Sequence, residues 1–189
     1  MAPTGSIRDR LVVAATELTT KEGWAAVTMS RLADMVGVSR QTVYNEIGTK
    51  PALAEAMILE ELSRFLAKVD QAFLDHPGDL SGAIEAAVVG VLRFAEGNAL
   101  LHAVVSATHG ADTELLPLLT THAGMLMGTA KAVIAERLTA YELPLTQEEL
   151  APVIDAIVRI ALSHVMQPSG TPEETAAGIS WIARRVLGS

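Results

Sequence analysis

Residues 28–53 read Thr-Met-Ser-Arg-Leu-Ala-Asp-Met-Val-Gly-Val-Ser-Arg-Gln-Thr-Val-Tyr-Asn-Glu-Ile-Gly-Thr-Lys-Pro-Ala-Leu. Leu32 and Val36 lie four residues apart, which places them on one face of a helix. Gly37 can adopt the left-handed conformation that ends this helix, and Ser39 can cap the next one by accepting a backbone N–H. The stretch therefore predicts two short helices joined by one tight turn, the arrangement of a helix-turn-helix.

The second of these helices has the side chains of a DNA reader. Val38, Val43 and Ile47 are expected to face the core. The polar residues then point largely outward, and those we expect to contact DNA are Arg40, Gln41, Thr42, Tyr44 and Asn45. Arg pairs well with guanine, Gln and Asn pair with adenine, and Thr offers a methyl group and a hydroxyl. These side chains suit a recognition helix in the major groove.

The residues that flank the two helices are suited to binding phosphate. Gly48 ends the second helix, and Thr49 can cap a third whose first turn carries Lys50 and Pro51. The exposed N–H groups of that turn and the Lys50 ammonium would together hold a DNA phosphate. Thr28 is expected to cap the first helix, and we also place it among the DNA-binding residues.

This part of the chain resembles the TetR family of bacterial transcriptional regulators. The resemblance rests on Thr28, Leu32-Ala33, Gly37-Val38-Ser39, Thr42-Val43-Tyr44, Gly48-Thr49-Lys50 and Leu53. The chain departs from the family pattern in two respects: Ile47 stands where a Phe is common, and the polar pair before it is Asn45-Glu46. The rest of the chain matches the family only in length and helical character.

The resemblance implies an all-α protein with two domains. Residues 1–50 would form a three-helix DNA-binding head, and residues 51–189 a helical ligand-binding and dimerisation bundle. The implied function is that of a ligand-responsive transcriptional regulator, a repressor that a small molecule releases from a palindromic operator. The other function considered is a helical small-molecule carrier or enzyme whose head only resembles a DNA binder.

Charge and composition are compatible with the first function. The net charge is −8 over 189 residues, whereas nucleic-acid binders are commonly basic. However, residues 1–50 hold six Lys or Arg and five Asp or Glu, a net charge of +1, so the acidic residues are concentrated in the second part. Arg31, Arg40 and Lys50 could then form a local basic face that binds DNA with clear salt sensitivity.

The composition also bears on compartment and cofactors. Cys is absent, which excludes disulfides and thiolate metal sites and is compatible with a reducing compartment. The sequence has no uninterrupted apolar run long enough for a membrane span and no signal-peptide pattern, so we expect a cytoplasmic protein without membrane contact. His102 and His109 match no metal-binding spacing, and no phosphate loop or nucleophile motif is present. We therefore expect no metal, no cofactor and no catalytic residue.

Helical periodicity continues throughout the chain. Expected helices cover residues 6–21, 49–75, 80–96, 99–109, 112–140, 147–165 and 172–187. Thr171-Pro172-Glu173-Glu174 forms a capped entrance to the last helix. Pro152 conflicts with an unbroken helix from residue 147, so a short irregular turn is expected before Ala151.

The two carboxy-terminal helices carry more apolar surface than they can readily hide within one chain. The residues concerned are Val153, Ile154, Ile157, Ile160, Ala161, Val165, Ile179, Ile182, Val186 and Leu187. In the family these two helices form a four-helix dimer interface, so a homodimer is expected here. The alternative is that both helices simply complete the core of a monomer.

Residues 84–130 combine many apolar side chains with isolated polar ones, as in a ligand cavity. The residues predicted to bind an effector are Phe94, His102, Ser106, His109, His122 and Met125. Few charges occur here, which favours an apolar or weakly polar molecule, although Arg93 could hold a carboxylate. The same composition also fits an ordinary packed core.

Overall fold

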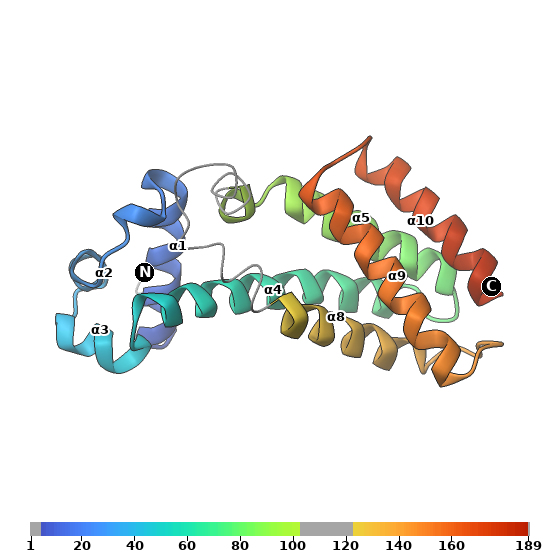
Figure 1. Ribbon diagram of the computed structural model, residues 1–189, viewed down its shortest axis with the longest axis horizontal. Coiled ribbons are helices and arrows are strands. Elements are labelled where there is room, and N and C mark those ends of the chain that lie inside the picture. The colour runs from blue at the N-terminus through green and yellow to red at the C-terminus, as the bar shows by residue number, and fades with distance from the viewer. Residues whose placement is uncertain (1–4, 103–122, 189) are drawn as a thin grey trace. The chain divides into compact units, whose positions relative to one another are not determined.

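The computed structural model describes residues 5–102 and 123–188, and every regular element within them is helical (Figure 1). The predicted all-α fold class is thus confirmed. Among these residues, none of the helices combines the length and apolar character that a membrane crossing requires.

The helices divide between two compact units. The elements are α1 (Ile7–Glu22), the 3-10 turn η1 (Trp24–Ala26), α2 (Met29–Val36), α3 (Arg40–Ile47), α4 (Lys50–Asp75), α5 (Leu80–Glu96), α8 (Ala123–Leu138), α9 (Gln147–Met166) and α10 (Pro172–Leu187). The first unit contains the residues up to Glu61 and the segment that begins at Ala99. The second contains residues 62–98 and those from Gly124 onward. Because the division falls at Glu61, helix α4 contributes to both units.

The first unit is organised around side chains contributed by four helices. Leu11 of α1, Leu32 of α2, Val43 of α3 and Leu53 of α4 are each completely buried in one apolar core. Helix α1 is anchored at its start by a reciprocal cap, in which the Ser6 side chain accepts from the N–H of the third helical residue and that residue's carboxylate accepts from the Ser6 N–H. The core thus holds the helix-turn-helix against α1 and the start of α4.

The second unit packs α5 against α10, with α9 in contact with both (Figure 1). The α5–α10 contact is close: the Ser180 hydroxyl donates to the Ser81 carbonyl at 3.1 Å, and Ser180 is almost completely buried. Helix α8 is linked to α9 by an ion pair between Lys131 and Asp155, whose nitrogen and oxygen lie 2.9 Å apart. Hydrogen bonds and apolar packing thus act together in this unit.

Most of the predicted helix bounds agree with the structure, with α5 and α10 matching at both ends. The predicted helices at 99–109 and 112–140 lie largely or partly outside the described residues. The irregular turn predicted before Ala151 is wrong, because α9 continues through Pro152. Thr146 and Glu149 form a capping box that starts the helix upstream, and Pro152 itself is solvent-exposed. Water can therefore solvate the backbone carbonyl that Pro152 leaves without a partner.

Candidate DNA-binding site

The turn between α2 and α3 has the predicted geometry. Gly37 adopts the left-handed conformation, with φ 74° and ψ 41°, and its N–H donates to the Ala33 carbonyl at 2.9 Å. The Ser39 hydroxyl then accepts from the Thr42 N–H at 3.0 Å, capping α3. Because both helix ends are satisfied by local bonds, the turn fixes the direction in which α3 leaves α2.

Helix α3 separates buried from exposed side chains as predicted. Val43 and Ile47 lie in the core, and Ile47 fills its place although the family commonly has Phe there. The exposed side chains include Arg40, Gln41, Tyr44 and Asn45. Thr42 is half-buried, and its hydroxyl lies 2.8 Å from that of Ser39.

The exposed side chains of α3 pair with each other along the helix. A guanidinium nitrogen of Arg40 donates to the Tyr44 hydroxyl at 3.3 Å, and the guanidinium lies 5.6 Å from the centre of the Tyr44 ring. One residue further along the helix, the Gln41 amide donates to the Asn45 side-chain oxygen at 3.0 Å. These contacts join residues four apart, which is the spacing at which helical side chains meet. They hold the polar groups on the exposed side of α3.

The start of α4 lies next to α3, as predicted. Gly48 ends α3 with φ 85°, and the Thr49 hydroxyl accepts from the Ala52 N–H at 3.3 Å. The ammonium of Lys50, in the first turn of α4, lies 4.8 Å from the centre of the buried Trp24 ring. A cation over an aromatic face is attracted to it, so Trp24 helps to hold the Lys50 side chain in place.

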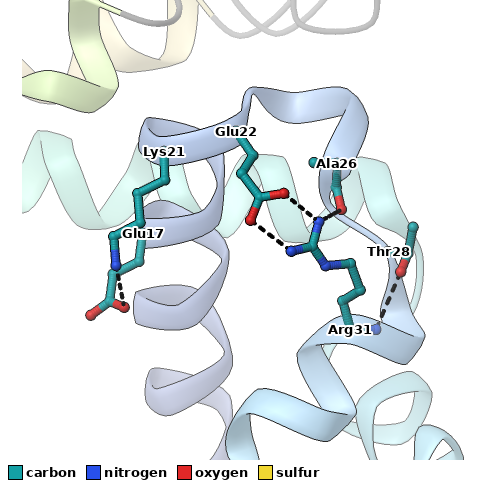
Figure 2. Close-up of polar contacts among 6 residues, drawn as sticks. All are labelled: Glu17, Lys21, Glu22, Ala26, Thr28 and Arg31. Atoms are coloured by element: carbon teal, nitrogen blue, oxygen red, sulfur yellow. Dashed lines mark hydrogen bonds and ion pairs between the residues drawn. The ribbon is translucent and has the colours of Figure 1, made fainter.

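The start of α2 differs from the sequence-based expectation in one respect. The Thr28 hydroxyl caps α2 by accepting from the Arg31 N–H at 3.2 Å, as predicted. Arg31, however, was expected to contribute to a basic DNA-binding face. Its guanidinium instead donates to both carboxylate oxygens of Glu22, at 2.7 and 2.8 Å, and to the Ala26 carbonyl at 3.3 Å (Figure 2). This hydrogen-bonded pairing lowers the pKa of the Glu22 carboxyl and raises the pKa of Arg31.

Two arginines that the sequence did not single out support the same motif from α1. Arg8 donates to the carbonyl of Glu46 at 2.9 Å, and Arg10 donates to the carbonyl of Val36. Both carbonyls belong to the last turns of helices, where cations are favoured and unpaired carbonyls need donors. The two arginines therefore tie α1 to the ends of α2 and α3. No local sequence signal predicts these bonds, because their partners lie 38 and 26 residues away.

The predicted effector-binding residues fall in different parts of the structure. Ser106, His109 and His122 lie outside the described residues, His102 is exposed in the first unit, and Phe94 and Met125 belong to the second. Phe94 is half-buried, and its ring packs edge-on against that of Phe65 with 4.8 Å between centres. Met125 has 46% of its surface exposed.

Arg93, which the sequence left as a possible partner for a ligand carboxylate, pairs with a carboxylate of the chain itself. Its Nε donates to Glu173 of α10 at 2.8 Å. In the described ranges, no three His, Cys, Asp or Glu side chains lie close enough together to hold a metal ion.

Two family models match the chain over most of its length. A model described as bacterial regulatory proteins of the tetR family matches residues 11–57, which include the whole helix-turn-helix. A second, described as the C-terminal domain of the bacterial tetracyclin repressor, matches residues 79–185.

Individual relatives point to the same family as these two models. The HTH-type transcriptional regulator AlkX of Mycobacterium tuberculosis is 31% identical over 175 residues, which cover 92% of this chain and 82% of that protein. The crystal structure of the TetR family repressor AlkX from Dietzia sp. strain DQ12-45-1b, implicated in biodegradation of n-alkanes, has a TM-score of 0.76 at 28% identity and covers 99% of this chain and 98% of that one. The R. erythropolis repressor QsdR shares the fold, with a TM-score of 0.60, 20% identity and coverage of 98% and 96%.

Regulators of this family bind DNA, dimerise and bind small-molecule ligands, and they are not enzymes. The alternative of a carrier or enzyme with a DNA-binder-like head is therefore set aside. The chain belongs to the TetR family of bacterial regulatory proteins and is a ligand-responsive, DNA-binding transcriptional repressor.

Proposed function

We propose that the chain represses transcription as a homodimer on a palindromic operator, which it leaves when an apolar molecule binds. The observation that carries this proposal is helix α3, whose buried side is locked into the core while its exposed side presents Arg40, Gln41, Tyr44 and Asn45. Residues 1–50 would form the DNA-binding domain and residues 51–189 the ligand-binding and dimerisation domain.

Base reading is assigned to α3. Arg40 is suited to the O6 and N7 acceptors of guanine, and Gln41 or Asn45 to adenine. In the free protein Arg40 contacts Tyr44, and Gln41 contacts Asn45. These side-chain contacts are exposed and weak, so base edges can replace them at little cost. Thr42, whose backbone N–H is capped by Ser39, adds a methyl group.

Phosphate binding is assigned to Thr28 and Lys50. The Thr28 hydroxyl stands at the start of α2, and Lys50 stands at the start of α4, where backbone N–H groups favour anions. Phosphate contacts position the protein without carrying base information. The two residues therefore set register and overall affinity, whereas α3 sets specificity.

The dimer interface is assigned to α9 and α10. Large apolar side chains of these helices remain exposed in the single chain, namely Leu162, Met166, Trp181, Ile182 and Val186. Exposed apolar surface of this kind is typical of a protein–protein contact. A two-fold arrangement would then place one DNA-binding head on each half of a palindrome.

The proposed effector is an apolar molecule of the alkane type or a weakly polar derivative. Support comes from the few charges in residues 84–130 and from similarity to a repressor implicated in n-alkane biodegradation. Within the second unit, Phe94 and Met125 are proposed to contact it. Because α4 begins beside the DNA-binding turn and continues into the second unit, a shift of its far end would move Lys50 and α3.

Selection of bound sequences from random duplex DNA tests the DNA-binding part of the proposal. A palindromic consensus is expected. Arg40→Ala should relax preference at one base pair and weaken operator binding by about 1–3 kcal/mol. Lys50→Ala should weaken binding to all DNA sequences equally and reduce the salt dependence of that binding. Unchanged affinity and preference in a folded Arg40→Ala protein would refute the assignment of Arg40.

Titration with long-chain n-alkanes, their terminal alcohols and fatty acids tests the effector. A coupling of about 1–3 kcal/mol would weaken operator binding by about 5–150-fold, and operator DNA must weaken effector binding by the same factor. A compound whose affinity is the same with and without operator is not the inducer.

A further inference from the structure

Glu22 and Arg31 form an ion pair in which each charge stands at an unfavourable helix end. Glu22 is the last residue of α1, and Arg31 lies in the first turn of α2. Helix dipoles disfavour an anion at a carboxyl end and a cation at an amino end. The two-fold hydrogen bond between the side chains, at 2.7 and 2.8 Å, compensates both charges (Figure 2).

The pair lies where a helix-turn-helix meets the DNA backbone. In such motifs the second helix enters the major groove while the first crosses the phosphates. Arg31 shares the first turn of this first helix with the capping residue Thr28 and the exposed Ser30. A guanidinium binds a phosphate with the same two parallel hydrogen bonds that it gives to a carboxylate. Glu22 therefore occupies the donors that a phosphate would use.

The pair is also accessible from solvent. The side chains of Arg31 and Glu22 are 43% and 49% exposed, so water and ions reach both. The two-fold hydrogen bond keeps the Arg31 guanidinium occupied in the wild-type protein. Removal of the Glu22 carboxylate would therefore leave this guanidinium open to a DNA phosphate.

We propose that Glu22 limits the DNA affinity of the head by withholding Arg31 from the phosphate backbone. Glu22 is a positioning residue, since it acts through Arg31. The inference rests on the proposed function only in using the docking geometry of α2 and α3. It assigns to Glu22 the role of keeping non-specific binding weak, so that the bases read by α3 contribute more of the discrimination between sequences.

The test compares Glu22→Gln with Glu17→Gln on random-sequence duplex DNA between 50 and 200 mM salt. Glu17 lies on the same helix, 3.9 Å from the ammonium of Lys21 (Figure 2), so its substitution removes the same charge without touching Arg31. Glu22→Gln should bind more tightly and show a salt slope steeper by about 0.9, the value for one further phosphate contact. Its advantage over wild type should then shrink by about 3.5-fold across this salt range. Glu17→Gln should keep the wild-type slope.

Three further variants separate this role from a purely structural one. Arg31→Gln alone should keep the wild-type salt slope, because Glu22 already withholds Arg31. Glu22→Gln combined with Arg31→Gln should lose the gain in affinity, and Glu22→Asp, which keeps the carboxylate, should behave as wild type. Thermal unfolding of each variant establishes that the folded protein is measured.

The proposal is overturned if the salt slope of Glu22→Gln is no steeper than that of Glu17→Gln. It is also overturned if Glu22→Gln still increases DNA affinity in a protein that carries Arg31→Gln. A shallower slope in Arg31→Gln alone also overturns it, since Arg31 would then already bind phosphate. Random duplex contains no selected operator, so these results do not depend on which bases α3 reads. Conversely, failure of the Arg40 assignment leaves the Glu22 measurement interpretable.

Discussion

Substitution of Ile182 is the sharpest test of the proposed dimer. Ile182 lies on α10 with 42% of its surface exposed, and Leu162, Met166, Trp181 and Val186 expose between 41 and 55%. Ile179, three residues before Ile182 on the same helix, is only 3% exposed. Ile182 is therefore expected to contribute to association, whereas Ile179 contributes to the fold of the single chain.

The size of the effect follows from the exposed fraction. Full burial of an Ile side chain contributes about 1.5–3 kcal/mol, so the exposed 42% leaves about 0.6–1.3 kcal/mol per copy for a partner to gain. Two copies contribute about 1.2–2.6 kcal/mol in a symmetric dimer. Because Ala keeps the Cβ and part of this burial, Ile182→Ala should weaken association by about 1–2 kcal/mol, or about 5–30-fold. Ile182→Asp should abolish the dimer at micromolar concentration, because its carboxylate would be buried without a partner.

Sedimentation equilibrium over a concentration series measures this change directly. Leu74→Ala is the matched control, since Leu74 is 66% exposed on α4 and lies outside α9 and α10. Ile157 is a poorer probe, because it packs partly against the core of its own chain. If Ile182→Asp remains a dimer with the wild-type dissociation constant, the interface lies elsewhere.

Three further predictions concern stability. Gly37→Ala should lower the free energy of unfolding by about 1–2 kcal/mol in a urea titration, because Ala is strained in the left-handed conformation. A Cβ at this position would meet no atom within 4 Å, so no steric clash adds to the strain. Gly37→Asn should lower the free energy of unfolding by less, since Asn tolerates this conformation. Arg10→Ala should destabilise the protein by about 1 kcal/mol by leaving the end of α2 without its donor, and equal stability of Arg10→Ala and wild type would show that the bond adds nothing. Burial raises the pKa of the Tyr141 hydroxyl above its ordinary 10.0, so its contribution to stability is complete below pH 10 and declines as the pH rises above that value. Tyr141→Phe also removes the bond to the His76 carbonyl. Between pH 8 and 10.5 its free energy of unfolding should fall by less than that of the wild type. An equal fall in both proteins would contradict this account.

The sequence determined those features whose atoms lie within a few residues of one another. Gly37 ends α2, Ser39 caps α3, and Thr171 caps α10 because each of these bonds closes over three or four residues. The exposed and buried sides of α3 follow from helical periodicity in the same way. Local geometry was therefore enough to predict the helix-turn-helix and to identify the family resemblance from the sequence.

The tertiary structure decided which charges remain available for a partner. The sequence shows Arg31 as a cation, but only the fold brings the carboxylate of Glu22 within hydrogen-bond distance of it. Arg93 is likewise paired with Glu173, 80 residues away. The fold also distinguishes Ile179, buried inside the chain, from Ile182, left exposed one turn later. Periodicity gives the face of a helix, whereas the packing of other helices against that face determines how much of it is covered.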